Sequence, residues 1–383
     1  MTRLLLLLIG AGLTVAATAW LPAPFVWVAA LWCVVAGAAA ALETTAWRRA
    51  LWINVGAVIM ALGGFELYLC QQELVRYEGS YTHGYSTEHD VLGYAPVPGR
   101  QSRAIKYHGK ELIYDTVYTI DSRGLRVSPP TDQSSTYGSI LFFGGSVTFG
   151  EGVDDARTMP YRVGVKTHGR YHVYNFGFHG YGPHQMLSAL EHDVVAPMVM
   201  GSPVTLVIYQ GMPAHVARAA GLSIWDQHGP KYVLSDQQGP AYLGHFDGHL
   251  SRPIRWLQNE LEKSFVFRKF REGQRAITPD DIRLYVAIVT RARDVAAARF
   301  PEAQFHVLLW GWRGEETFDA IRDGLQKANI TVHQINDILP RYTDNPASYE
   351  LSPHDRHPTA QAHELIADYV ATHIIGKATN AAR

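Results

Sequence analysis

From residue 139 onward, short apolar runs alternate with longer segments of helical composition. Such alternation is typical of a parallel sheet with helices on both faces, because each crossover between parallel strands is long enough to hold a helix. We therefore expect an α/β fold of three layers over residues 137–383. The expected strands are Ser139–Phe143, Tyr171–Tyr174, Val204–Tyr209, Gln304–Trp310 and Thr331–Ile335, and the expected helices are Thr158–Thr167, His184–Val194, Ala214–Ala220, Pro279–Phe300, Glu316–Ala328 and Ala360–Ile375.

The first 71 residues contain three apolar segments that are nearly free of charge: Leu4–Leu21, Phe25–Leu42 and Ala50–Leu69. Each has the length that a helix needs to cross a hydrocarbon core about 30 Å thick. A cleaved signal peptide is the rival interpretation of the first segment, and the two segments that follow argue against it. We expect residues 1–71 to be an anchor of three transmembrane helices.

Arginines flank these segments unevenly. Arg3 precedes the first segment, Arg48 and Arg49 lie between the second and third, and the Pro22–Pro24 turn has no charge. Because loops rich in Lys and Arg stay in the cytoplasm, three crossings place everything after Gln71 outside. The expected location is a bacterial cytoplasmic membrane with the α/β domain in the periplasm.

Two further regions complete the predicted organisation. Residues 72–136 form a β-rich connector, with a strand at 111–120 and a loop at 90–99, which either covers a sheet edge or contacts glycan. Residues 222–275 interrupt the alternation and contain a predicted β-hairpin around Ser235–Pro240. This insertion is either a lid that selects substrate or a surface excursion.

Candidate catalytic residues lie at both ends of the α/β region. Ser146 follows the strand Ser139–Phe143 and two glycines, which permit a sharp turn at the strand's carboxyl end, where ligands bind in open α/β sheets. A serine hydroxyl needs a base to remove its proton, and His357 is the candidate, with Asp355 to orient its ring. These three residues predict acyl-transfer chemistry through a covalent intermediate.

The order and spacing of these blocks resemble the SGNH (GDSL-like) hydrolase superfamily. Gly145-Ser146 resembles its first block, Asn175 to Gly182 its second, and Asp355-x-His357-Pro358 its last, and the likeness covers roughly residues 137–375. The resemblance implies a flavodoxin-like three-layer fold. It also implies that Gly180, with Ser146, lends a backbone N–H to the oxyanion hole.

The third block departs from the family. Where Gly-x-Asn-Asp is expected, the chain has Gln210-Gly211-Met212-Pro213, so Gln210 is the candidate for the missing amide donor. Asn175, His215 and Arg218 are possible substrate-binding residues. Trp310 and Trp312 either pack in the core or line a sugar platform.

The expected function is that of a serine esterase or acyltransferase acting on acylated envelope glycan or lipid, with hydrolysis and transfer both open. The altered third block motivates an alternative, a non-catalytic glycan-binding or scaffold protein. With a net charge of −1 and no basic cluster beyond the arginine pair, nucleic acid is not an expected partner. No motif predicts a metal or a cofactor. The sequence gives no indication of the oligomeric state.

Overall fold

The computed structural model describes residues 2–21, 23–76, 78–82, 84–131, 137–199, 201–235, 239–272 and 275–376. Contacts between residues group the chain into two units. The first, here called the anchor unit, comprises Met1–Glu78 and His249–Ala276. The second, called the α/β unit, comprises Gly79–Gly248 and Ile277–Arg383, so the β-rich connector clusters with the α/β domain.

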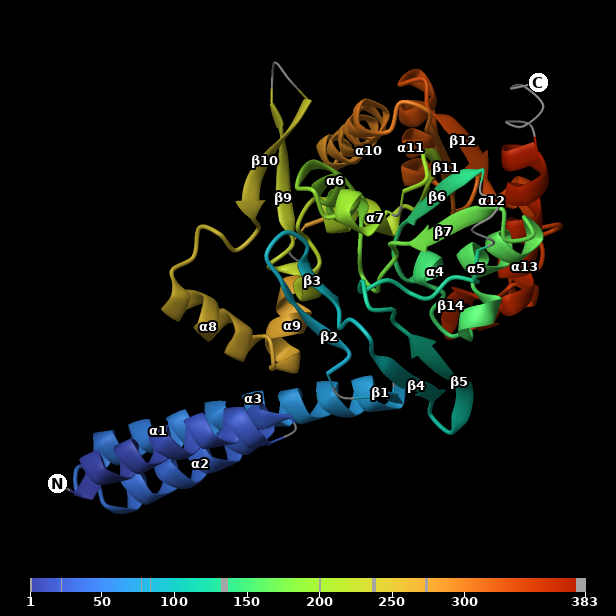
Figure 1. Ribbon diagram of the computed structural model, residues 1–383. Coiled ribbons are helices and arrows are strands. Elements are labelled where there is room, and N and C mark those ends of the chain that lie inside the picture. Colours follow the sequence, from blue (N-terminus) through green and yellow to red (C-terminus); the bar gives the residue numbers. More distant parts are fainter. Residues whose placement is uncertain are drawn as a thin grey trace. The chain divides into compact units, whose positions relative to one another are not determined.

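The α/β unit is built on a parallel sheet of five strands in the order β12-β11-β8-β6-β7 (Figure 1). The strands are β6 (Gly138–Phe143), β7 (Tyr171–Asn175), β8 (Val204–Gly211), β11 (Gln304–Leu309) and β12 (Thr331–Gln334). Every residue of β6 is buried, as expected of a central strand covered on both faces. The expected α/β fold with a parallel sheet is confirmed.

Alternate residues of the strands supply two separate cores. Leu141, Phe143 and Val207 belong to one cluster with side chains of α6 and α10, whereas Ile140, Phe142 and Ile208 belong to another with side chains of α5 and α13. Side chains of a strand point alternately to opposite faces, so these two clusters define a three-layer unit. Its helices are α4 (Ser146–Phe149), α5 (Met159–Lys166), α6 (Pro183–Glu191), α7 (Ala214–Ala219), α10 (Pro279–Arg299), α11 (Glu316–Lys327), α12 (Ile335–Ile338) and α13 (Ala360–Tyr369), which continues as a π-helix over Val370–Ile375.

The connector contains two small sheets. β1 (Glu78–Tyr81), β4 (Gln101–His108) and β5 (Glu111–Thr119) form one, and β2 (Ser86–His89) pairs with β3 (Gly93–Pro96) in the other. The interpretation of 90–99 as a loop was therefore wrong for Gly93–Pro96 and holds for the turns on either side, because Gly93, with φ of 84°, lets the chain turn directly into β3. The expected hairpin of the insertion is present as β9 (Pro230–Ser235) and β10 (Gly239–His245).

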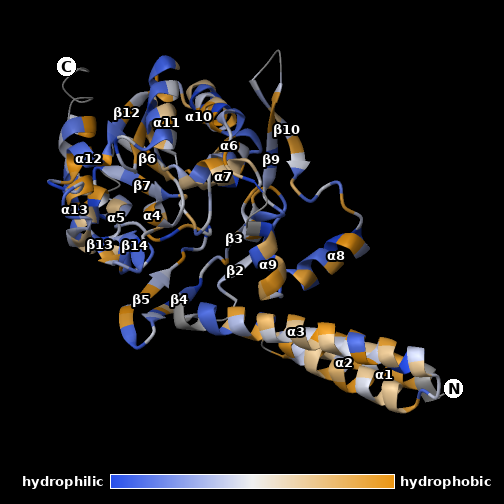
Figure 2. Ribbon diagram, turned by 180° about the vertical axis from the view of Figure 1, so that it is seen from behind, coloured by the Kyte–Doolittle hydropathy of each residue, from blue (hydrophilic) through white to orange (hydrophobic). Residues whose placement is uncertain are grey.

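The anchor unit contains α1 (Thr2–Trp20), α2 (Pro24–Ala41) and α3 (Ala46–Arg76), which Figure 2 shows mostly in white and orange. Pro24–Ala41 and Ala46–Glu73 are long and apolar enough to cross a membrane, whereas the apolar part of α1, Leu5–Thr18, is shorter. The unit also holds α8 (Arg252–Leu261) and α9 (Phe265–Glu272), two helices of the insertion that the sequence analysis did not predict.

Candidate active site

The turn between β6 and α4 presents Ser146 as the first residue of a short helix. Gly144 has a φ of 155°, and a Cβ there would lie 2.2 Å from Thr148 Oγ1. A Cβ on Gly145 would lie 2.7 Å from Arg218 Nη1. Glycine is required at 144, where φ is positive, whereas a side chain at 145 would displace the end of Arg218. The tight turn leaves the partly exposed Ser146 at the carboxyl end of the sheet.

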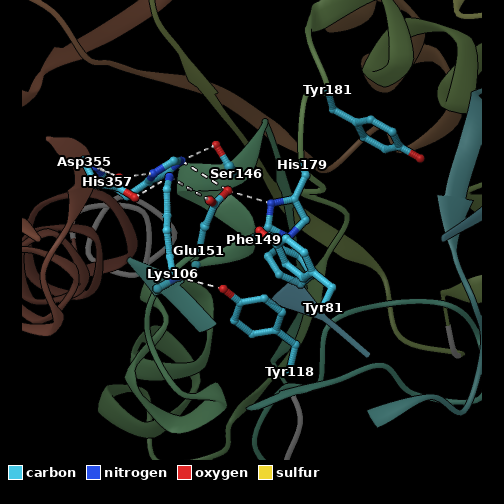
Figure 3. Close-up of polar contacts among 12 residues, drawn as sticks. Tyr81, Lys106, Tyr118, Ser146, Phe149, Glu151, His179, Tyr181, Asp355 and His357 are labelled. Atoms are coloured by element: carbon cyan, nitrogen blue, oxygen red, sulfur yellow. Dashed lines mark hydrogen bonds and ion pairs between the residues drawn. The ribbon is translucent and has the colours of Figure 1, made fainter. Parts of the chain in front are cut away.

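Ser146, His357 and Asp355 form a hydrogen-bonded triad (Figure 3). Ser146 Oγ lies 2.8 Å from His357 Nε2, and His357 Nδ1 lies 2.5 Å from Asp355 Oδ1. The last two residues come from β14 (Asp355–Pro358), which pairs with β13 (Glu350–Ser352) in a short hairpin. The backbone N–H of His357 also donates to Asp355 Oδ1 at 3.0 Å, so the carboxylate fixes both the ring and its backbone.

A lysine from the connector completes the environment of Asp355. Lys106 lies in β4, and its Nζ is 2.6 Å from Asp355 Oδ2 and 3.9 Å from Glu151 Oε1. The Asp355 side chain is almost fully buried, and a buried carboxylate is costly unless it is paired. The connector therefore contributes a charged group to the triad.

Glu151 is a second carboxylate beside His357. Its Oε2 lies 3.3 Å from His357 Nε2 and 2.7 Å from His179 Nδ1, while His179 Nε2 lies 2.9 Å from the Tyr85 hydroxyl. The Tyr114 hydroxyl donates to Glu151 Oε1 at 3.2 Å. His357 Nε2 thus lies between the Ser146 hydroxyl and the buried Glu151 carboxylate.

These charges shift the acid–base properties of the site. Burial alone would lower the pKa of His357, but the Glu151 and Asp355 carboxylates outweigh it and raise that pKa above its usual value. Burial would raise the pKa of Glu151, yet the neighbouring His357 and His179 hold it below the usual range. His357 and Lys106 likewise keep the pKa of Asp355 low against its burial.

Donor atoms of Glu151, Asp355 and His357 lie within 4.8 Å of one another, a spacing that is also compatible with a metal ion. The Lys106 ammonium lies within 4 Å of both carboxylates, 2.6 Å from Asp355 Oδ2 and 3.9 Å from Glu151 Oε1. Its positive charge opposes a cation at this place.

Arg126 holds the loop that follows the nucleophile helix. Its buried guanidinium donates to the carbonyls of Phe149, Gly150 and Val153, and its Nε lies 2.7 Å from Asp155 Oδ1. The Gly124-Leu125-Arg126 turn of the connector thus fixes the segment that carries Glu151.

Asn175 and Gly180 belong to the loop after β7. The Asn175 amide donates to the Thr148 carbonyl at 3.0 Å and accepts from the Gly177 N–H, so Asn175 braces α4 and the loop. Gly180 is partly exposed with φ of 74°, and a Cβ there would lie 2.5 Å from both Trp225 Nε1 and the Tyr94 hydroxyl. The loop is therefore packed tightly at the place where the resemblance implies an oxyanion donor.

The three candidates around the altered third block lie behind the nucleophile turn. Gln210 is buried, and its Nε2 donates to the adjacent Gly211 carbonyl at 3.0 Å; no contact described in the structure joins its amide to Ser146. His215 Nδ1 lies 2.8 Å from the Tyr209 hydroxyl, and Arg218 donates to the Tyr181 carbonyl at 2.7 Å. Burial, with the charge of Arg218, lowers the pKa of His215, which keeps this imidazole neutral.

Trp310 and Trp312 both pack against Tyr342. The buried Trp310 donates its indole N–H to the Tyr342 hydroxyl, and Trp312 stacks on Tyr342 with ring centroids 4.9 Å apart. His354, next to Asp355, stacks on His108. Arg356 also lies over the Trp312 ring, with its Cζ 5.6 Å from the ring centroid, so both tryptophans contact neighbouring side chains.

Three residues of the site were absent from the sequence analysis: Lys106, Glu151 and His179. Lys106 comes from a connector strand about 250 positions away from Asp355 in the sequence, and no spacing reveals such a pair. Glu151 lies five residues after Ser146, and the bond between the Glu151 N–H and the Ser146 carbonyl at 2.9 Å brings it back beside the triad. A charged residue immediately after the glycine-bounded nucleophile turn was the one signal available.

No family model and no curated protein matches this chain. Among solved structures it is similar to a lipolytic protein of the G-D-S-L family from Desulfitobacterium hafniense, at 14% identity and a TM-score of 0.34, covering 61% of this chain and 98% of the other. It is also similar to a GDSL-like lipase from Parabacteroides merdae, at 15% identity and a TM-score of 0.35, covering 64% and 99%. An acetyl xylan esterase from Butyrivibrio proteoclasticus matches at 13% identity and a TM-score of 0.34, covering 66% of each chain.

All three structures match at TM-scores below 0.5 and at identities of 15% or less. Their low identities and TM-scores say nothing of the substrate of this chain. The chemistry of the site is therefore argued from its own side chains.

Proposed function

We propose that this protein is a membrane-anchored serine hydrolase of acyl esters, with Ser146 as nucleophile, His357 as general base and Asp355 as the residue that orients it. The observation that carries the proposal is the continuous chain of contacts from Ser146 Oγ through His357 to Asp355, at 2.8 and 2.5 Å. Nucleophile and base within hydrogen-bond reach, with the base held by a third group, is the arrangement that activates a serine.

In the first half of the reaction, Ser146 Oγ attacks the ester carbonyl while its proton passes to His357 Nε2. The oxyanion that forms is placed beside the N-terminus of α4, where the backbone N–H groups of Ser146 and Gly180 are the proposed donors. Glu151 stabilises the imidazolium that His357 becomes. His357 then gives this proton to the leaving alcohol, and the acyl group remains on Ser146.

In the second half, His357 removes a proton from the acceptor hydroxyl, whose oxygen attacks the acyl-serine carbonyl. His357 then returns this proton to Ser146 Oγ as the bond between the acyl group and Ser146 breaks. With water as acceptor the reaction is hydrolysis, and with a sugar hydroxyl it is transfer. The apolar helices α2 and α3 and the arginine asymmetry support a site outside a bacterial cytoplasmic membrane. Acylated envelope glycan or lipid is the proposed substrate class.

A serine-directed fluorophosphonate tests the nucleophile directly. We expect intact-mass analysis of the full chain to show one adduct, mapped to Ser146 and absent from Ser146→Ala. Ser188→Ala is the matched control, because Ser188 is buried on α6 away from the triad. Absence of labelling in the folded wild-type protein would favour the non-catalytic glycan-binding or scaffold role.

Acyl transfer is measured separately. Incubation with an acetyl ester and an oligosaccharide acceptor should yield free acetate, acetylated oligosaccharide, or both. The product ratio distinguishes hydrolysis from transfer without changing the assignment of Ser146.

A further inference from the structure

The insertion in the α/β domain contains two helices that cluster with the N-terminal helices. α8 (Arg252–Leu261) and α9 (Phe265–Glu272) lie in the segment His249–Ala276, which belongs to the anchor unit. The chain thus leaves the α/β unit after Gly248 and returns to it at Ile277.

A buried carboxylate joins this segment to the third N-terminal helix. Glu66 of α3 accepts hydrogen bonds from the Ser264 hydroxyl at 2.8 Å and from the backbone N–H groups of Phe265 and Val266 at 2.7 and 2.9 Å. These N–H groups begin α9 and have no intrahelical partners, so Glu66 caps the helix from outside. Lys263 donates to the Thr18 carbonyl near the end of α1 at 2.9 Å.

The position of Glu66 along α3 gives the depth of this junction. Glu66 lies 20 residues after Ala46, where α3 begins, and Arg48 and Arg49 lie in the first turn. A rise of 1.5 Å per residue makes this about 30 Å, the thickness of one hydrocarbon core. From Arg49 to Glu66, 17 residues, the same rise gives about 26 Å, so the turn between α8 and α9 lies nearly one hydrocarbon thickness from the arginine pair.

α8 is amphipathic. Ile254, Leu257 and Leu261 follow the three- and four-residue spacing that places them on one face, while Arg255 and Asn259 lie on the opposite face. Figure 2 shows orange and blue residues mixed along α8 and α9, in contrast to the paler α2.

Large apolar side chains of both helices are exposed. Phe270 of α9 is 74% exposed, and Ile254, Trp256 and Leu257 of α8 are 50–56% exposed. Water is an unfavourable surrounding for such a cluster, whereas the lipid–water boundary accommodates apolar and aromatic side chains beside charged ones.

The charge of the segment favours an anionic surface. Between His249 and Ala276 the sequence has seven Lys or Arg and three Glu. Each basic side chain near an anionic membrane surface contributes about 1 kcal/mol of attraction.

We propose that α8 and α9 lie in the outer lipid–water boundary of the membrane that α2 and α3 cross, with their apolar side chains among the acyl chains and their basic side chains on anionic headgroups. This inference rests on the proposed membrane anchor. Four observations support a lipid surface as the surroundings of α8 and α9. They are the contact with α3 through Glu66, the depth of that junction, the exposed apolar face and the excess of basic residues.

Site-directed spin labelling of the full chain in nanodiscs tests this placement. In a background with Cys33→Ala and Cys70→Ala, a nitroxide is attached at Leu257→Cys or Phe270→Cys, and at Asn259→Cys as the matched control on the polar face of α8. Collision rates with oxygen, which concentrates in lipid, and with a water-soluble nickel complex report the depth of each label. We expect several-fold less collision with nickel at 257 and 270 than at 259.

A label at Val58→Cys, on the exposed side of α3, tests the membrane anchor separately from the interfacial placement of α8 and α9. If 58 is in hydrocarbon but 257 and 270 collide with nickel as often as 259, the interfacial placement is overturned and the anchor stands. If 58 itself is in water, the proposed anchor fails. Low collision with both reagents at 257 and 270 would mean that protein covers this face, which also overturns the proposal.

The preference for anionic lipid is tested by comparing nanodiscs of phosphatidylcholine with nanodiscs that also contain phosphatidylglycerol. We expect labels 257 and 270 to lie deeper in the mixed lipid. Equal depth in both would overturn the role of the basic side chains.

Discussion

Glu66 in the anchor unit and Glu151 in the α/β unit are both buried, at 3% and 8% exposed, yet their partners differ in kind. Glu66 accepts from a serine hydroxyl and two backbone N–H groups, none of which titrates near neutral pH. Glu151 lies against the imidazoles of His179 and His357.

This difference separates a structural carboxylate from a functional one. The hydroxyl and backbone N–H partners of Glu66 do not change charge near neutral pH, so the contact between α3 and α9 should not depend on pH there. Glu151 raises the pKa of His357, the proposed general base, so in the proposed mechanism Glu151 couples the reactivity of Ser146 to pH.

The largest loss of ester turnover is expected from a substitution in the α/β unit. Ser146→Ala removes the nucleophile and should lower ester turnover by about 10⁴-fold or more, because no other group takes over acylation. Glu66→Gln is the control that should retain turnover. An equal loss of kcat/KM in Glu66→Gln would mean that Glu66 is needed for turnover, which would contradict its purely structural role.

Loss of the cap should open α9 locally. Glu66→Ala removes three hydrogen bonds to a charged acceptor, which we expect to cost about 2 kcal/mol, or roughly a 30-fold larger open population. Hydrogen exchange of the amides of Phe265 and Val266 would report this opening. Glu73→Ala provides the comparison on the same helix, since Glu73 is exposed and pairs only with Arg268 among the contacts described.

The Glu151 carboxylate should set the acid limb of the pH–rate profile. His357 acts as a base only when neutral, and Glu151 raises its pKa, so activity rises at a higher pH than an isolated imidazole would give. Glu151→Gln should move this limb of kcat/KM to lower pH. An unmoved limb, or an equal shift in Glu364→Gln, whose partners are Arg162 and Lys166, would remove the coupling.

The smallest effect is expected at Gln210. The resemblance implies an amide donor there, whose loss would lower kcat by about 10²-fold. In the structure this amide bonds the neighbouring Gly211 carbonyl, so we expect Gln210→Ala to change kcat by less than about threefold and to lower thermal stability instead. A fall near 10²-fold at unchanged stability would restore Gln210 as an oxyanion donor.

The sheet and the triad could be predicted because their signals are local. The apolar run ending at Phe143 predicts a buried strand, the glycines after it predict the turn, and the pairing of Asp355 with His357 needs only two residues of separation. Each signal lies within a few positions of the residue that it identifies.

The rest depends on contacts between distant segments. Lys106 reaches Asp355 from the connector, and Glu66 reaches Ser264 across about 200 residues. The amphipathic pattern of α8 extends over ten residues only, which is too short to stand out beside the neighbouring hairpin. These pairs of residues come together only in the folded protein, so they could not be predicted from one sequence.

The route of the chain has a consequence for proteolysis. Three segments connect the two units, near residues 78, 248 and 276, and α8 and α9 lie between the last two. A single protease cut after α3 would break the covalent link between the N-terminal helices and the α/β unit. The larger fragment would still contain α8 and α9. The Glu66 bonds to residues 264–266 would keep the pieces together. If the proposed anchor holds the protein in a membrane, a nicked molecule should therefore stay there, and release of the α/β unit requires more than one cut.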